Sequence, residues 1–388
     1  LPYLARVLGP EAYGHMVWVQ TIMLFGTIGV DFGFGWSATR EISAHRHDSV
    51  RVSHLFANVW AVQWGLAVLF ALGVICAVFI YEGFRYPPAV YIVGLGIVLG
   101  QVLLPLWLFQ GLEALREVAA IQFLAKLLAL PLAFLWVKGP QDVLWALMFL
   151  SSSSLLAGVM SLVWMRYRRL VKWVRPDVAG MQSALSGGAL LFSSRALISL
   201  YTVLVPLAVG YWSGATQLAY FNLADKLRNV VQALMSPVSQ ALFPRMSWLF
   251  QHDVSGAYAL LRRLAVALSA VSGLAGFVLL AGADPLMVLL GGADFVNGAA
   301  VLRWLAFVPV VVALSNLMGV QIMVPQGMNK PFTAILALAS LVSVLCLYPM
   351  VSFGGAIGAA QLVMGVECVV TSSMAFYLWR FWRQENKS

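Results

Sequence analysis

The chain has 388 residues, of which 61% are hydrophobic and only 10% are charged, and its mean hydropathy is +0.87. Soluble domains carry about 25% charged residues, so this composition excludes a soluble globular protein and predicts a polytopic membrane protein. The net charge of +9 could indicate nucleic acid or acidic lipid. In a membrane protein it more often reflects lysine and arginine held in cytoplasmic loops, and we expect no nucleic-acid partner.

A membrane-spanning helix needs about 20 predominantly apolar residues. Charges, glycines and prolines punctuate the chain into eleven such segments, namely 13–37, 53–80, 88–110, 117–137, 142–165, 183–210, 215–243, 259–282, 299–325, 331–351 and 354–379. Residues 1–8 resemble the end of one more helix, so we expect a twelve-helix plan whose first helix is truncated here. The segments are too long for barrel strands, which alternate over about 10 residues. The expected fold is therefore all-α.

The basic residues indicate the orientation, because lysine and arginine gather in cytoplasmic loops. One set of loops and the C-terminal tail hold sixteen of them: Arg40, Arg46, Arg51, Arg116, Arg166, Arg168, Arg169, Lys172, Arg175, Arg245, Arg262, Arg263, Lys330, Arg380, Arg383 and Lys387. The alternate loops hold three, Arg6, Arg85 and Lys138. This asymmetry predicts that the first set of loops and the C-terminus are cytoplasmic.

A basic cytoplasmic linker, 166–177, divides the chain into an N-terminal bundle, 1–170, and a C-terminal bundle, 178–388. At an offset of 205 residues, Gly9, Arg40, His47 and Asp48 fall on Gly214, Arg245, His252 and Asp253. Six spans in each half give both halves the same orientation. We therefore expect two six-helix bundles with pseudo-two-fold symmetry and a central cavity, which is a common transporter plan.

A polar stripe runs along the span 215–243. It consists of Asn222, Asp225, Asn229, Gln232, Ser236 and Ser239, whose spacings of three and four residues place them on one helical face. Lys226 and Arg228 flank the stripe. A membrane helix with one polar face turns that face to protein or water rather than to lipid. At the same offset of 205, part of the stripe falls on Gln20, Thr27 and Asp31, so the matching helices are expected to line one cavity.

Charges within the spans predict an anion site. The preceding span adds Arg195, followed by Ser199 and Thr202 on the same face. With Asp225, Lys226 and Arg228 the cluster would cost about 10 kcal/mol in lipid, if each charge costs roughly 2.5–3.5 kcal/mol. Pairing of Asp225 with Arg228 would offset part of this cost. The cluster has a net charge of +2, which suits a phosphate or diphosphate in a water-filled cavity.

Other intramembrane charges allow structural and functional interpretations. Lys126 could reach the membrane surface with its long side chain, and Arg303 fits an interfacial position. Asp31 and Glu367 could pair structurally or could couple transport to an ion, as intramembrane acids often do. The HRHD segment at 45–48 resembles a metal cluster, but it lies in a basic loop with no cysteine or second acid nearby, so we expect no metal site.

Six motifs, in order along nearly the whole chain, resemble the O-antigen and polysaccharide flippases. They are PYLARVLGPEAYG at 2–14, VDFGFGWSATREISAHRHD at 30–48, WLFQGLEALR at 107–116, NLADKL at 222–227, ALFPRMSWL at 241–249 and LMVLLGGADF at 286–295. This family is part of the multidrug/oligosaccharidyl-lipid/polysaccharide exporter superfamily, which includes lipid II flippases and multidrug exporters.

The resemblance implies two bundles around a V-shaped cavity in the bacterial inner membrane. It implies that undecaprenyl-diphosphate-linked oligosaccharide, such as an O-antigen repeat unit, moves from the cytoplasmic to the periplasmic leaflet by alternating access. Membrane lipids and O-antigen assembly proteins such as the polymerase are the implied partners. The sugar varies across the family and does not carry over to this chain.

In this interpretation Arg195, Lys226 and Arg228 attract the diphosphate and the polar stripe hydrogen-bonds the sugars. A proton or sodium gradient could drive transport, with Asp31, Asp225 or Glu367 as titrating candidates. No P-loop is present, which argues against intrinsic ATP use, and no cofactor or catalytic residue is expected.

Three alternatives stay open. The first is a drug or small-cation exporter on the same fold, which would favour uncompensated acids in the cavity. The second is a membrane enzyme acting on lipid-linked sugars, which the short outer loops disfavour. The third is a flippase for a different envelope polymer.

Overall fold

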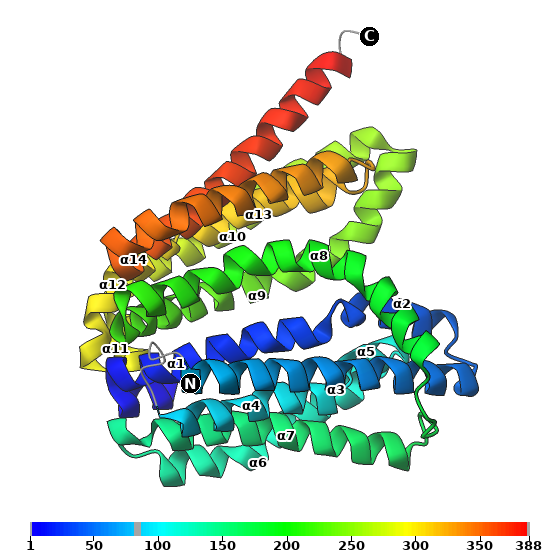
Figure 1. Cartoon of the computed structure of the whole chain (residues 1–388). Coiled ribbons are helices and arrows are strands. Elements are labelled where there is room, and N and C mark those ends of the chain that lie inside the picture. The colour runs from blue at the N-terminus through cyan, green and yellow to red at the C-terminus, as the bar shows by residue number, and fades with distance from the viewer. Residues whose placement is uncertain (1, 81–86, 386–388) are drawn as a thin grey trace. The chain divides into compact units, whose positions relative to one another are not determined.

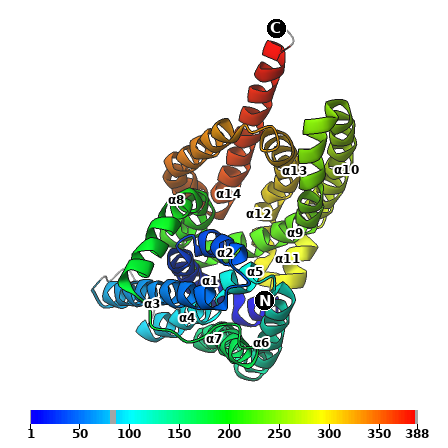
Figure 2. The same cartoon turned by 90° about the vertical axis from the view of Figure 1, so that its right-hand side faces the viewer.

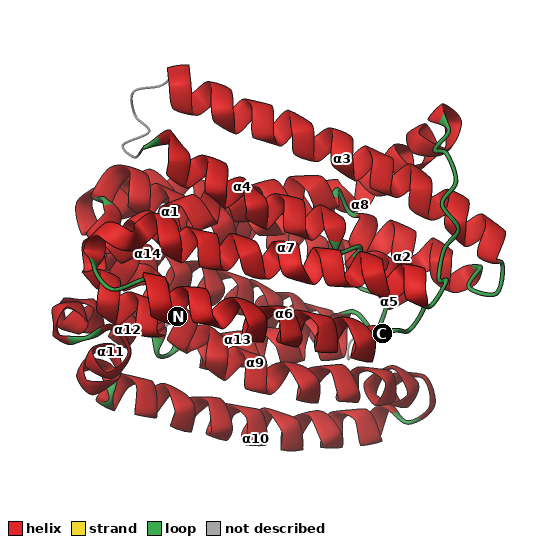
Figure 3. Ribbon diagram, turned by 90° about the horizontal axis from the view of Figure 1, so that it is seen from below, coloured by secondary structure: helices red, strands yellow, loops and turns green. Residues whose placement is uncertain are grey.

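The computed structural model describes residues 2–80 and 87–385, and several side chains within 190–202 and 236–244 lie outside that description. In the described part every regular element is helical, as the composition predicts (Figure 1, Figure 3). All eleven predicted spans coincide with helices. Eight segments of the described chain are each long and apolar enough to cross a membrane. The prediction of an all-α membrane protein is confirmed.

The chain forms two compact units. The first unit, His15–Val203, contains most of α1 and of α8. Its elements are α1 (Pro2–Asp31), α2 (Phe34–Ala44), α3 (Ser49–Ile80), α4 (Pro88–Leu103), α5 (Leu106–Gly111), α6 (Leu115–Trp136), η1 (Pro140–Asp142), α7 (Val143–Tyr167) and α8 (Val178–Ala208). Within it α4, α6 and α7 run side by side (Figure 3).

The second unit combines Leu1–Gly14 with Leu204–Ser388. Its further elements are η2 (Val209–Ser213), α9 (Ala215–His252), α10 (Val254–Ala281), α11 (Ala283–Gly291), η3 (Ala293–Gly298), α12 (Ala299–Leu305), α13 (Val308–Met318), η4 (Gly319–Met323) and α14 (Asn329–Glu385). Figure 2 shows α9 beside α10 in this unit. The boundary between the two units falls between Val203 and Leu204 rather than at the basic segment 166–177. The two six-span bundles, 1–170 and 178–388, stay a prediction.

Two of the predicted spans in the first unit are broken. The span 13–37 breaks between α1 and α2, where Phe32 and Gly33 have φ values of 41° and 78°. Glycine adopts this left-handed conformation without steric cost, whereas Phe32 is strained there. The ring of Phe32 stacks on that of Phe192, with centroids 4.7 Å apart, and this contact supports the strained position.

The span 88–110 breaks between α4 and α5 at Pro105. Leu104 precedes the proline and leaves the helical region, with φ −103° and ψ 86°, because a following proline ring clashes with a helical backbone. A break inside a membrane frees carbonyl groups that lipid cannot hydrogen-bond. Side chains take two of them: Trp60 Nε1 donates to Val102 O (2.9 Å) and Ser161 Oγ donates to Leu103 O (2.9 Å). Just after the break, Thr39 Oγ1 donates to Trp107 O of α5 (3.1 Å).

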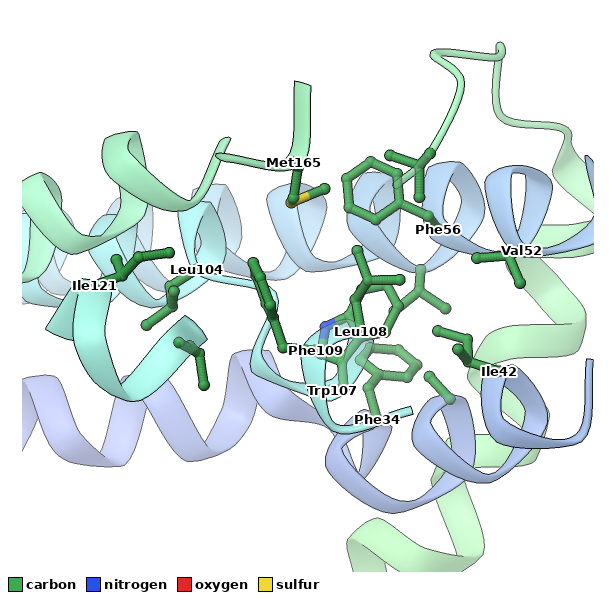
Figure 4. Close-up of a cluster of buried hydrophobic side chains, with 14 of the residues drawn as sticks. Phe34, Ile42, Val52, Phe56, Leu104, Trp107, Leu108, Phe109, Ile121 and Met165 are labelled. Carbon is green, nitrogen blue, oxygen red and sulfur yellow. The ribbon is translucent and has the colours of Figure 1, made fainter. Parts of the chain in front are cut away.

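Large side chains fix the positions of α2 and α5 in the first unit. Phe34 and Ile42 of α2 pack with Trp107, Leu108 and Phe109 of α5 in a buried cluster (Figure 4). Val52 and Phe56 of α3 and Met165 of α7 complete this part of the core. Both broken spans are thus held by one apolar cluster directly beside their breaks.

Small residues let α4 and α7 approach closely. A Cβ on Gly158 would lie 2.4 Å from Leu103 Cβ, and one on Gly100 would lie 2.4 Å from the Ser154 carbonyl carbon. Small residues at helix contacts allow the close packing on which membrane helices depend. The approach also brings Ser161 within reach of the Leu103 carbonyl (2.9 Å).

Polar loop residues cap the helices of the first unit. Asp48 of the HRHD segment accepts the backbone N–H groups of Val50 (3.1 Å) and Arg51 (3.0 Å) at the start of α3. The basic segment is tied to α3 as well, because Asn58 Nδ2 donates to Asp177 Oδ2 (2.9 Å) and Asp177 N donates to Asn58 Oδ1 (2.8 Å). The hydrogen bonds from Asn58 and from the Gly180 N–H hold the pKa of Asp177 below its ordinary value of 3.8.

We predict that Gly158→Ala destabilises the protein by about 1–3 kcal/mol, since the added methyl group overpacks the contact with α4. Gly65→Ala is the matched control, because a Cβ on Gly65 in α3 meets nothing within 4 Å and alanine favours a helix by roughly 0.5–1 kcal/mol. Thermal unfolding in detergent measures both. Equal loss of stability in the two variants would contradict close α4–α7 packing.

We predict that Asp177→Ala lowers the unfolding temperature at pH 7 and that its difference from wild type narrows as the pH falls below 3.8. The pKa of Asp177 is depressed in the folded state, so its carboxylate stabilises the fold above the unfolded pKa and stops doing so as pH falls through the folded pKa. The exposed Glu11 provides the control Glu11→Ala. A difference that does not change with pH would contradict the prediction.

Candidate functional site

The polar face of α9 is positioned by close contact with the start of α1 in the second unit. A Cβ on Gly14 would lie 1.9 Å from the carbonyl oxygen of Ala215, so only glycine permits this approach. The neighbouring Tyr13 is fully buried, and its ring packs edge-on against Phe295, with centroids 5.9 Å apart. The contact places the Tyr13 hydroxyl against α9.

Lys226 is held by Tyr13. Its Nζ donates to the Tyr13 hydroxyl (3.0 Å) and lies 5.4 Å from the centroid of the same ring. The hydroxyl in turn donates to Asn222 Oδ1 (3.2 Å). Among the side chains that the structure describes, no carboxylate lies within ion-pair distance of Lys226. The ammonium group is therefore fixed by a neutral hydrogen-bond network, and Asp225 acts on it electrostatically without a direct ion pair.

Arg228 is paired instead. Its guanidinium donates to Asp225 Oδ1 from Nε (2.8 Å) and Nη2 (2.7 Å), as the spacing of three residues predicts. Asn229 Nδ2 donates to the other oxygen of Asp225 (2.8 Å), and Arg228 Nη2 donates to Asn229 Oδ1 (3.0 Å). Glu367 of α14 also interacts electrostatically with Arg228. Asp225 thus compensates the charge of Arg228 by direct contact.

The last part of the stripe binds neighbouring helices. Ser239 Oγ donates to Asn316 Oδ1 of α13 (3.1 Å), and Gln321 Nε2 of η4 donates to Ser239 O (2.9 Å) and to Ser239 Oγ (3.0 Å). Gln232 is half-buried, and the side chain of Ser236 lies outside the description. The stripe therefore contacts protein at Ser239, and its role in lining a cavity stays a prediction.

Several predicted site residues lie elsewhere. The side chains of Arg195, Ser199 and Thr202 in α8 fall outside the described residues, so the role of Arg195 stays a prediction. Asp31 belongs to the first unit and lines a cavity there. Glu367 belongs to the second unit. Their suggested role in ion coupling stays a prediction for both.

The two remaining intramembrane charges have surface positions. Arg303 pairs with Asp284, and both side chains are about half exposed, at 46% and 51%. Lys126 is exposed and lines a small polar pocket of 140 Å³ in the first unit with Gln122 and Ser153.

Sequence reasoning missed Tyr13, Asn316 and Gln321. Tyr13 lies in the segment 2–14, which we used only for its resemblance to a family motif. Its hydroxyl can be paired with α9 only when the contact between α1 and α9 is known. Asn316 and Gln321 are isolated polar residues in an apolar span. Their spacing of five residues matches no single α-helical face, and it becomes meaningful through the wider turn of η4, a π-helix.

The apolar helices and the charged network buried among them define a multi-pass membrane protein. Residues 1–250 match the family described as polysaccharide biosynthesis protein. A protein of Escherichia coli (strain K12) named "Putative O-antigen transporter" is 31% identical over 97% of this chain and 91% of its own length. A protein of the same name from Shigella dysenteriae is 27% identical over 96% of this chain and 93% of its own length. This chain belongs to the polysaccharide biosynthesis protein family.

Solved structures share the fold. An inward-facing multidrug resistance MATE family transporter of the MOP superfamily has a TM-score of 0.77, with 13% identity, over 100% of this chain and 94% of that chain. The lipid II flippase MurJ, in an inward closed conformation, also has a TM-score of 0.77, with 12% identity, over 97% of this chain and 83% of that chain. At this identity the likeness establishes the fold alone.

We predict that Asp225→Asn costs about 1–3 kcal/mol of stability, because it leaves the Arg228 charge without its nearest carboxylate. The control is Asp284→Asn, which breaks the exposed pair with Arg303 and should cost about 0–1 kcal/mol. The side chains of Arg228 and Asp225 are only 13% and 27% exposed, which is the reason for the difference. Thermal unfolding measures it, and equal losses would show that the α9 pair is as solvated as a surface pair.

Proposed function

We propose that this protein flips undecaprenyl-diphosphate-linked oligosaccharide, of the O-antigen repeat-unit type, from the cytoplasmic to the periplasmic leaflet of the bacterial inner membrane. Membership of the polysaccharide biosynthesis protein family supports this function. So do two relatives named as O-antigen transporters, which match it along almost its whole length. The protein would carry its substrate without chemical change, and its C-terminus would be cytoplasmic.

The observation that carries the proposal is Lys226. A charged amine within a membrane helix is costly and marks a substrate or ion path more often than a packing contact. Asp225 forms its ion pair with Arg228, and it acts on Lys226 electrostatically without a direct contact. Lys226 is thus the basic group available to a diphosphate, and Arg195 would add the excess positive charge.

The mechanism we propose is alternating access. Lys226 and Arg195 bind the diphosphate, the polar face at Asn222 and Asn229 offers hydrogen bonds to the head group, and the prenyl chain stays in lipid. Release follows when the site opens to the periplasm. An ion gradient would drive the cycle through Asp31 or Glu367, whose protonation would change the balance of charge in each unit.

A multidrug exporter is the second candidate, and the fold shared with a MATE transporter favours it. The fold supports many functions, so it does not decide between them. A cation exporter needs an acid without a compensating base. In the described part of the second unit the cluster offers the reverse, a lysine without a carboxylate.

We predict that Lys226→Gln slows flipping of a lipid-diphosphate oligosaccharide in proteoliposomes by about tenfold or more, the loss expected for one charge-assisted contact. The exposed Lys330 provides the matched control Lys330→Gln, which should flip at the wild-type rate. Unfolding temperatures of both variants separate lost transport from lost folding. A folded Lys226→Gln variant that flips normally would remove Lys226 from the substrate path.

A further inference from the structure

The first unit holds a second polar site, separate in sequence from the α9 face. It is a cavity of about 410 Å³ among α1, α2, α3, α4, α5 and α8, within the range of roughly 300–1,000 Å³ typical of small-molecule sites. Asp31 and Gly33 line it on either side of the α1–α2 break, and Leu104 and Leu106 line it on either side of the α4–α5 break. Two broken membrane helices therefore meet at one cavity.

Helix breaks of this kind point to a ligand. Irregular backbone is tolerated at membrane depth where it lines a cavity, and discontinuous helices build the substrate sites of many transporters. Here side chains already satisfy the carbonyls beside Pro105, and the core cluster fixes α2 and α5. The cavity is therefore a built feature of a well-supported region.

Amide side chains dominate the polar lining. Gln63, Gln101 and Gln110 line the cavity from α3, α4 and α5. Gln63 is only 2% exposed, and its oxygen accepts from Trp107 Nε1 (3.1 Å). Among the described residues its amide nitrogen has no hydrogen-bond partner, and Gln101 has none at either end. These amide groups line the cavity, where water or a ligand can hydrogen-bond them.

The lining selects a class of ligand. The lining residues that the structure describes include no lysine or arginine, so this part of the cavity does not suit a diphosphate. Their one carboxylate is Asp31, whereas a site for a hard cation needs several oxygen ligands. Amides both donate and accept, as the hydroxyl groups of a sugar do. Trp36, at 64% exposure, lines the same cavity and offers an indole face against which the C–H face of a sugar ring can pack.

We propose, resting on the function proposed above, that this cavity binds a sugar residue of the lipid-linked substrate through the amides of Gln63, Gln101 and Gln110, with Trp36 as the stacking surface. The substrate is then recognised by two chemistries. Lys226 in the second unit takes the charged diphosphate, and the amide-lined cavity in the first unit takes a sugar. The cavity lining, rather than the charged face, determines which oligosaccharide is accepted.

Saturation-transfer NMR on the whole protein in nanodiscs tests this proposal. The probes are six free saccharides, namely glucose, galactose, mannose, rhamnose, N-acetylglucosamine and glucuronate, with tetraphenylphosphonium as a cationic probe. Gln101→Leu and Trp36→Ala should weaken binding of the recognised saccharide about tenfold, the loss expected when a hydrogen-bonding or stacking group is removed. The matched controls are Gln141→Leu, at an exposed amide of the same unit, and Trp248→Ala, at a 56% exposed indole.

Three results would overturn the proposal. In the first, none of the six saccharides binds to the wild type. In the second, the cavity variants bind the saccharide as well as the wild type does. In the third, only tetraphenylphosphonium binds, and Asp31→Asn abolishes that binding. The last would assign the cavity to a cation. Unfolding temperatures identify a variant that fails to fold, and Gln110→Leu then replaces it.

Flipping assays on the same variants separate this proposal from the function on which it rests. In one outcome, Gln101→Leu and Trp36→Ala flip the lipid-linked substrate at the wild-type rate and bind saccharide as the wild type does. This outcome would overturn the sugar site and leave the flippase function standing. Saccharide binding that depends on Gln101 and Trp36, in a protein that flips nothing, would support the sugar site and overturn the function.

Discussion

Hydrocarbon forms no hydrogen bonds, and this constraint governs each feature of the structure. Every polar group within a membrane helix needs a partner from protein, water or ligand. At the Pro105 break, Trp60 and Ser161 supply that partner to freed carbonyls. On α9, Asp225 supplies it to Arg228 and Tyr13 supplies it to Lys226. Polar groups that have no partner within the protein are therefore the candidates for contact with a transported substrate.

The structure contains two kinds of polar site among its membrane helices. The α9 face carries charge, and its one lysine without a carboxylate partner among the described residues is held by an aromatic ring and a hydroxyl. The first-unit cavity carries amides and a single acid. A lipid-linked oligosaccharide presents the same two chemistries, a charged diphosphate and neutral sugar hydroxyls, and its long prenyl chain needs neither site.

Hydropathy alone predicted the helices, because spans of about 20 apolar residues have no other stable arrangement in a membrane. It did not predict the breaks at Phe32–Gly33 and Leu104–Pro105, since short apolar interruptions look like continuous spans. Helical spacing predicted the Asp225–Arg228 pair. It could not predict the binding of Lys226 to Tyr13, which lies 213 residues away, or show that Gln63, Gln101 and Gln110 share a cavity. Such contacts depend on tertiary packing.

The support of the broken spans has a consequence for how the protein can diversify. The side chains that support the backbone around the Pro105 break come from α2, α3 and α7, and none of them is among the described residues that line the cavity. Substitutions at Gln101 or Trp36 therefore leave the backbone supports in place. If the cavity selects the sugar as proposed, exchange of a few lining residues would change the accepted oligosaccharide while the same scaffold is kept, so that variation of the carried glycan would require little structural change.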